Sequence, residues 1–112
     1  MLDLRKNPRY PTRAKANIHG IFRGENILKD LSITGCCVEC ASMAILETGV
    51  HYKMTIEPER ASHIGSFELL VEKKWVNSDN NLIEIGFFIV ASPKGKQFQY
   101  YMDYLAYRNS NP

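Results

Sequence analysis

The segment LIEIGFFIV, residues 82–90, is apolar at almost every position, and Glu84 is its only charged residue. Such a run is typical of a β-strand that is buried on both faces, because a strand with one solvated face alternates apolar and polar residues. We therefore predict that one face of this strand lines the interior of a β-barrel. The other face should be covered by the part of the chain that follows.

Five segments upstream also carry strand patterns. They are ANIHGIFR (16–23), NILKDLS (26–32), GCCVECA (35–41), VHYKMTIE (50–57) and SFELLVEKKWV (66–76). Turn-forming residues separate them, at 23–26, 34–35, 48–49 and 77–81. Alternation in the fifth segment places Phe67, Leu69 and Val71 on one face, and Trp75 falls on the same face beyond Lys73. Trp75 is therefore predicted to be a barrel residue.

Helix signals follow the last strand. Ser92 and Pro93 supply a capping hydroxyl and a proline suited to the first helical position, and no helix breaker follows Gly95 up to residue 108. An apolar stripe at helical spacing is formed by Phe98, Tyr101, Met102 and Leu105. The predicted fold class is all-β, a single domain built as a six-stranded antiparallel barrel with a C-terminal α-helix.

The composition is typical of an ordinary soluble domain. Of the 112 residues, 45% are hydrophobic and 23% are charged. No apolar run approaches the roughly 20 residues that a membrane span needs, and the basic N-terminal residues are not followed by the apolar core of a secretory signal. We expect a cytoplasmic protein without a membrane partner.

The three cysteines lie close together in the sequence. Cys36, Cys37 and Cys40 supply three soft ligands, but no fourth ligand stands at the spacing of a zinc site. In a strand, Cys36 and Cys40 share a face with Val38, and reduced cysteine is among the most buried residue types. Core thiols are therefore favoured, and no metal is predicted.

Nothing in the sequence resembles a catalytic arrangement. His19, His51 and His63 lie in separate strand or loop contexts, away from any nucleophile. Glu57 and Glu59 flank a proline in a predicted turn, where solvated charge is the simpler explanation. We expect neither an enzyme nor a cofactor.

Positive charge is concentrated near the N-terminus. Residues 1–15 hold five basic residues and one acidic residue, a formal charge of +4 in a chain whose total is +2, so the other 97 residues carry −2. A protein that binds single-stranded nucleic acid would need a basic groove across its body. The negative charge of residues 16–112 counts against such a protein. A compact anion site near the N-terminus is favoured.

Two short motifs follow one another along the chain. Arg5 and Arg9 form R-x-x-x-R, and 21 positions beyond Arg9 the segment from Asp30 through Ser32 to Gly35 forms D-x-S-x-x-G. Together with six strands and a terminal helix, this pair resembles the PilZ domain family over nearly the whole chain. The resemblance implies a PilZ-type barrel that acts, without catalysis, as a receptor for the bacterial second messenger cyclic di-GMP.

A second R-x-x-x-R is formed by Arg9 and Arg13. Arg5 and Arg9 are preferred as the motif, because Arg13 falls inside or at the edge of the first strand. This register divides the chain into a flexible N-terminal arm, residues 1–11, and the barrel with its helix, residues 12–112. We expect the arm to become ordered on the ligand.

The resemblance implies that cyclic di-GMP is contacted by Arg5, Arg9, Asp30, Ser32 and Gly35. Guanine chemistry suits these residue types, because a guanidinium donates to O6 and N7 together while a carboxylate accepts from N1 and N2. The serine offers a short hydroxyl, and the glycine lets the backbone turn and a flat ligand approach. Trp75 is added as an aromatic side chain suited to stacking on a purine.

Leu4 bears on the stoichiometry. In the family an arginine immediately before the first motif arginine accompanies a bound pair of nucleotides, and leucine stands at that position here. One nucleotide per chain is therefore predicted. The signal is expected to pass to an unidentified effector protein through a rearrangement of the arm and the surface.

Alternatives remain for the motif and for the function. Asp30, Ser32 and Gly35 also suit an ordinary hairpin turn, and Arg5 and Arg9 also suit a solvated tail. The alternative function is a PilZ-like protein-interaction domain without nucleotide binding. Some relatives of that kind lack the two motifs, whereas this sequence keeps them.

Overall fold

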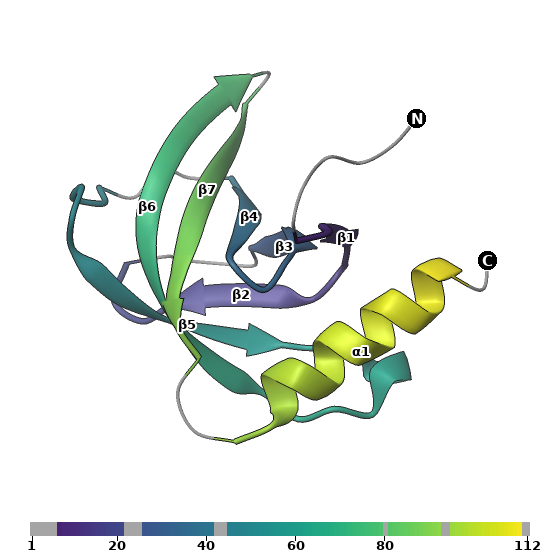
Figure 1. The fold of residues 1–112 in the computed structure, drawn as a ribbon. Helices are drawn as coiled ribbons and strands as arrows, with labels where there is room; N and C mark the ends of the chain where they lie inside the picture. The colour runs from purple at the N-terminus through teal and green to yellow at the C-terminus, as the bar shows by residue number, and fades with distance from the viewer. Residues whose placement is uncertain (1–6, 22–25, 42–44, 80, 93–94, 111–112) are drawn as a thin grey trace.

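The computed structural model describes residues 7–21, 26–41, 45–79, 81–92 and 95–110 (Figure 1). The strands are β1 (Tyr10–Pro11), β2 (Lys15–Ile18), β3 (Ile27–Leu31), β4 (Gly35–Cys40), β5 (His51–Glu57), β6 (Phe67–Asp79) and β7 (Leu82–Ala91). The helices in these residues are a short 3-10 helix, η1 (Arg60–Ser62), and the α-helix α1 (Gln97–Ser110).

Six of the strands close into an antiparallel barrel. Neighbouring strands follow the order β3-β2-β5-β6-β7-β4, and β4 pairs again with β3, which completes the ring. These six strands correspond to the six predicted segments, but β2 ends at Ile18 and not at residue 23 as predicted, because the chain turns at Gly20, where φ is 78°. The predicted fold class, an all-β six-stranded antiparallel barrel with a C-terminal helix, is confirmed.

The seventh strand, β1, is an addition that the sequence patterns did not predict. Tyr10 pairs with Leu31 and Pro11 pairs with Asp30, so β1 continues along the edge of β3 that also carries β2. A two-residue strand has no detectable alternation, and proline cannot donate to the ladder. The last two residues of the predicted arm, residues 1–11, are thus part of the sheet.

Alternation in β4 and β7 builds much of the barrel interior. The inward-facing pairs of this ladder are Cys36 with Phe87, Val38 with Ile85, and Cys40 with Ile83. Cys36 and Cys40 are at most 2% exposed, and both are free thiols, as the core interpretation predicts. Cys37 is also buried and free, but it lies on the opposite face of the strand.

The β6–β7 hairpin is longer than predicted, because β6 continues to Asp79 through most of the predicted turn at 77–81. A β-bulge between Lys73 and Trp75 interrupts its register. Trp75 consequently pairs with Gly86, which stands between two inward-facing residues of β7 and faces outward. The prediction that Trp75 shares the inner face is wrong, since the bulge reverses the alternation before it.

Helix α1 begins at Gln97, five residues after the predicted cap at Ser92. Gly95 has a positive φ of 98°, which a right-handed helix cannot include. The first helical hydrogen bond runs from the Tyr100 backbone N–H to the Lys96 carbonyl, at 2.9 Å. The predicted helix start is therefore wrong, although the helix itself is confirmed.

Helix α1 lies at one end of the barrel, opposite the end where β6 finishes and β7 begins (Figure 1), and its buried residues are Tyr101, Met102 and Leu105. The rings of Phe98 and Tyr101 lie 5.8 and 6.1 Å from the ring of Phe67 at the start of β6. The part of the outer face of β7 around Phe88 and Val90 stays uncovered, because these side chains are 45% and 44% exposed. The prediction that the following element covers this face is wrong, because the helix uses its stripe at the barrel end.

A polar cluster fastens α1 to the segment before β2. Glu59, between β5 and η1, accepts at Oε1 from the Arg13 backbone N–H at 2.9 Å and from the Tyr101 hydroxyl at 3.1 Å. The hydroxyl of Thr12 lies 3.3 Å from the same oxygen and 2.6 Å from the Tyr101 hydroxyl oxygen. At Oε2, Glu59 accepts from the guanidinium of Arg108 at 2.6 Å.

This cluster fixes the charge state of its members. Partial burial disfavours the carboxylate form of Glu59, but hydrogen bonds from Arg13, Arg108 and Tyr101 outweigh it and hold the pKa of Glu59 below its ordinary value of 4.5. Burial raises the pKa of Tyr101 to about 12, so its hydroxyl stays neutral. The carboxylate can therefore accept from all of its donors at neutral pH.

Tyr101→Phe should lower the free energy of unfolding by about 1–3 kcal/mol, because it leaves Thr12 and Glu59 with an unmet hydrogen bond in a buried setting. Urea denaturation measures the change. The matched control is Tyr100→Phe on the exposed face of α1, 54% exposed, which should change stability by less than about 0.5 kcal/mol. Equal effects of the two substitutions would contradict this account.

Glu59 should also make the fold sensitive to acid. Because its folded pKa is lowered, its contribution is complete above its ordinary value of 4.5 and is lost as the pH falls through the folded value. The difference in unfolding free energy between the wild type and Glu59→Gln should therefore shrink below pH 4.5. Urea titrations at a series of pH values measure it, and a difference independent of pH would rule the carboxylate out.

Candidate functional site

An irregularity in the β3–β4 ladder directs Asp30 outward. The register shifts between Leu28 and Asp30, which makes Lys29 the extra residue of a β-bulge. Strict alternation would place Leu28 and Leu31 on opposite faces, yet both are fully buried in the core. The bulge leaves Asp30 on the outer face, opposite Cys37.

Arg9 meets Asp30 on this outer face. The Arg9 Nη1 lies 3.4 Å from the Asp30 Oδ1, and the two side chains are 24% and 28% exposed. The Arg9 Nη2 would lie 3.6 Å from a Cβ placed on Gly35, so the guanidinium also reaches the beginning of β4. Three of the predicted site residues thus come together, whereas Arg5 lies outside the described residues.

Ser32 organises the turn between β3 and β4. Its hydroxyl donates to the Gly35 carbonyl at 3.1 Å and accepts from the Thr34 and Gly35 backbone N–H groups at 3.2 and 3.0 Å. Its backbone N–H also donates to the Gly35 carbonyl at 2.9 Å. The side chain is buried and turned toward the turn backbone. This is the arrangement that the hairpin-turn alternative describes, and a direct contact of Ser32 with a ligand remains a prediction.

Gly35 is required for close packing rather than for backbone freedom. The described glycines with a positive φ are Gly20, Gly49 and Gly95, so the backbone of Gly35 does not itself require glycine. A Cβ at this position would meet the Phe87 carbonyl oxygen at 2.8 Å. Any side chain here would push β4 away from β7 and block the surface that Arg9 covers.

A row of residues on the outside of the barrel leads from Asp30 to Trp75. The ladders of the sheet place Asp30, Cys37, Gly86 and Trp75 in one row across β3, β4, β7 and β6, on the outside of the barrel. The indole of Trp75 lies over Gly86, because a Cβ there would meet ring atoms at 2.3 and 2.4 Å. Trp75 is 37% exposed, so one part of the ring packs on β7 while another faces solvent.

Glu84 completes the charge pattern of this surface. It accepts from the Lys29 ammonium at 2.9 Å and from the Cys37 thiol at 3.5 Å, and the bond to Lys29 lowers the pKa of Glu84. Burial raises the pKa of Cys37 to about 12, so this residue is a neutral thiol. The surface next to Arg9 therefore offers paired charges near the buried thiol of Cys37 and the partly exposed indole of Trp75.

A depression of about 170 Å³ adjoins the Arg9 segment. Pro8 and Tyr10, on either side of Arg9, form one wall together with Ile33 from the β3–β4 turn. Helix α1 supplies the other wall through Gln99, Met102, Asp103 and Ala106. The candidate site thus borders the helix as well as the sheet.

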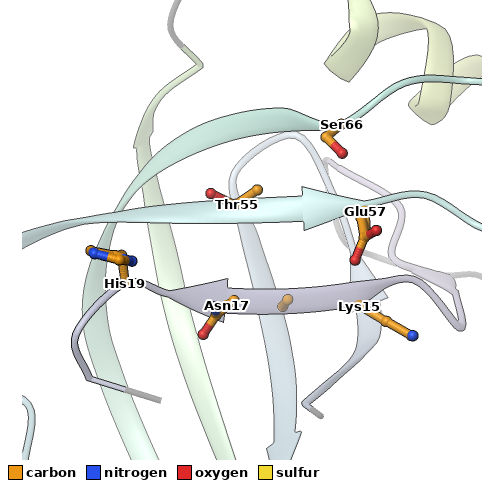
Figure 2. Close-up of a pocket in the computed structure, with 7 residues that line it drawn as sticks. Lys15, Asn17, His19, Thr55, Glu57 and Ser66 are labelled. Carbon is orange, nitrogen blue, oxygen red and sulfur yellow. The ribbon is translucent and has the colours of Figure 1, made fainter. Parts of the chain in front are cut away.

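Another depression lies on a different side of the barrel. Figure 2 shows its lining side chains on β2 and β5, on His19 just after β2 and on Ser66 just before β6. Its volume is about 240 Å³. It is lined by Lys15, Ala16, Asn17, His19, Thr55, Glu57 and Ser66, none of which is a predicted site residue. Since β2 and β5 occupy the side of the ring away from β4 and β7, this depression is separate from the Arg9 surface.

The described residues were also compared with the requirements of a metal site and of a membrane span. Among the described residues no group of three histidine, cysteine or acidic side chains is placed to hold a metal ion. Nor does any helix in those residues combine the length and apolar character needed to cross a membrane.

Sequence reasoning overlooked two features of the site, the bulge at Lys29 and the glycine at Gly86. A glycine inside a strand signals a close approach by another group, so Gly86 was open to detection. The bulge leaves no comparable trace, because its cause is the burial of Leu28 and Leu31 together.

Comparison with known proteins supports the fold. No protein-family model matches the chain, and no curated protein sequence is significantly similar to it. Among solved structures it is similar to the Bacillus subtilis inhibitor of motility MotI/DgrA, a PilZ-domain protein, with a TM-score of 0.79 and 16% sequence identity over 98% of this chain. The chain spans about half of that structure, 53% of its length. The PilZ-type fold expected from the motifs is confirmed.

Gly86→Ala should displace the Trp75 indole, because the new methyl group would overlap the ring. We expect a red shift of tryptophan emission and a loss of about 1–3 kcal/mol in stability. Trp75 is the only tryptophan of the chain, which makes emission a direct reporter. Gly65→Ala is the matched control, since a Cβ there has no neighbour within 4 Å. Unchanged emission in Gly86→Ala would contradict the described packing.

Proposed function

We propose that the chain is a non-catalytic receptor for cyclic di-GMP that acts in the bacterial cytoplasm. The observation that carries the proposal is the meeting of Arg9 with Asp30 and Gly35 on the outside of a PilZ-type barrel. These residues come from the two motifs, 21 positions apart, and the bulge at Lys29 directs the carboxylate toward the arginine.

The two charged groups suit guanine in complementary ways. A guanidinium donates to the O6 and N7 acceptors and a carboxylate accepts from the N1 and N2 donors, so adenine is rejected at both edges. Arg9 can also offset phosphodiester charge, and Arg5 is proposed as the second cation. Asp30 stands in one row with Cys37, Gly86 and Trp75, and the partly exposed indole of Trp75, which covers Gly86, is proposed to stack on a base.

The Arg9–Asp30 contact is long for an ion pair. It is 3.4 Å long and joins side chains that are 24% and 28% exposed. The charge-assisted hydrogen bonds that a nucleotide could make to each group would be shorter than this contact and would replace it.

A second candidate function is a PilZ-like protein-interaction domain without nucleotide binding. It is favoured by one observation, the exposure of Phe88 and Val90 on the outer face of β7 at 45% and 44%. The two functions are compatible, because this face lies beside the proposed nucleotide surface and a ligand there would change it. An effector protein is accordingly part of the proposal.

Isothermal titration calorimetry with cyclic di-GMP tests the proposal. Separate titrations with GTP and cyclic di-AMP are the specificity controls. Arg9→Ala and Asp30→Ala should each weaken binding by about 5- to 150-fold, the equivalent of 1–3 kcal/mol. Asp30→Ala should in addition narrow the preference over cyclic di-AMP. One nucleotide per chain is expected.

Arg13→Ala is the matched control, because it removes the same charge from the same segment while the backbone N–H that bonds Glu59 remains. It should change the affinity by less than about twofold. Absence of binding by the wild type would overturn the receptor proposal and leave the protein-interaction function. Loss of binding in Arg13→Ala but not in Arg9→Ala would move the motif by four positions.

A further inference from the structure

Arg108 and Glu59 belong to neither motif, yet both hold the chain close to Arg9. The guanidinium of Arg108 donates to the Glu59 carboxylate at 2.6 Å through Nη1 and to the Pro11 carbonyl at 2.8 Å through Nη2. The two side chains are 35% and 18% exposed. Arg108, near the C-terminal end of α1, thus forms hydrogen bonds to both the β5–β6 connection and β1.

On their other edge, residues 11–13 are hydrogen-bonded to β3, which carries Asp30 of the candidate site. Pro11 pairs with Asp30 in the β1–β3 ladder, and the Thr12 backbone N–H donates to the carbonyl of the bulge residue Lys29 at 3.0 Å. Residues 11–13 therefore lie between β3, which carries Asp30, and the contacts of Arg108 with Glu59 and Pro11, which we call the clamp. Each side of this segment is fixed by hydrogen bonds from a different element.

Arg9 stands only two residues before this segment. Two residues of extended chain span at most about 7 Å, so the place of Pro11 limits where the Arg9 guanidinium can reach. The depression walled by Pro8, Tyr10 and α1 joins the same parts from the outside. A change in the position of Arg9 would consequently alter the contact between Pro11 and Arg108 on α1.

We propose that Glu59 and Arg108 are positioning residues of the nucleotide site and that they couple its occupancy to α1. This inference rests on the proposed function. The contacts of Arg108 with Glu59 and Pro11 hold residues 11–13 in the position that brings Arg9 to Asp30. A ligand bound to Arg9 strengthens these contacts and so stabilises the position of α1. Coupling of this kind is reciprocal, because a contact that favours ligand binding is itself favoured by the bound ligand.

The coupling differs from a merely structural role in what it changes. A carboxylate that only stabilised the fold would alter the melting temperature and leave the affinity of folded molecules unchanged. A positioning carboxylate alters the affinity of molecules that are fully folded. It also makes amide exchange in α1 depend on the ligand, although α1 supplies neither motif.

The experiment compares Glu59→Gln with Glu57→Gln in the full chain, with cyclic di-GMP as the probe. Glu57 is exposed and lies two residues away at the end of β5, so its substitution removes an equal charge outside the clamp. Calorimetry at a temperature where circular dichroism shows both variants folded should give about 5- to 20-fold weaker binding for Glu59→Gln, within the range of ordinary coupling. Glu57→Gln should stay within about twofold of the wild type.

Hydrogen exchange supplies the second readout. In the wild type, cyclic di-GMP should slow amide exchange along residues 97–110, and this slowing should be absent in Glu59→Gln. Arg108→Lys keeps the charge but cannot donate to Glu59 and Pro11 in the same fork geometry, so an intermediate affinity is expected. This variant serves as the test if Glu59→Gln does not fold.

The outcomes separate the two proposals. Wild-type protein that does not bind cyclic di-GMP overturns the receptor proposal and this inference with it. Wild-type protein that binds, with unchanged affinity in Glu59→Gln or Arg108→Lys, overturns only the inference. Ligand binding that leaves exchange in α1 unaltered also overturns the coupling while the receptor function stands.

Discussion

The pairing of β3 with β4 is the contact on which both the barrel and the candidate site depend. It joins the two ends of the strand order and so closes the ring. Its bulge lets Leu28 and Leu31 both enter the core while Asp30 stays at the surface. A regular ladder would expose a leucine or bury an aspartate, and an unpaired buried carboxylate is far more costly than a local irregularity. Closure of the core and presentation of the carboxylate are therefore one structural solution.

The strands and the helix could be predicted because each rests on a local pattern. Alternation in the six segments and the stripe of α1 reflect burial directly, and so do the core thiols Cys36 and Cys40. The failures arose where one residue breaks a pattern. The bulge before Trp75 reverses a face, and the left-handed Gly95 delays the helix. Neither effect is encoded in the average propensity of the neighbouring residues.

The candidate site divides in the same way. The motif resemblance pointed to Arg9 and Asp30, which the structure brings within 3.4 Å, although periodicity alone could not relate residues 21 positions apart. The contact of Glu59 with Arg108 joins residues 49 positions apart and was invisible in the sequence, where Glu59 reads as a solvated charge in a turn. Such pairs depend on where the barrel places its connections, which is known only once the fold is known.

The row from Asp30 to Trp75 lies on the outer face of strands whose inner faces form the core. Inner positions along each of these strands are therefore constrained by packing in the core, whereas outer positions determine the character of the surface. A TM-score of 0.79 at 16% identity shows that a largely different sequence carries the same architecture. A barrel of this kind is an adaptable scaffold, on which new surfaces evolve while the interior keeps its architecture.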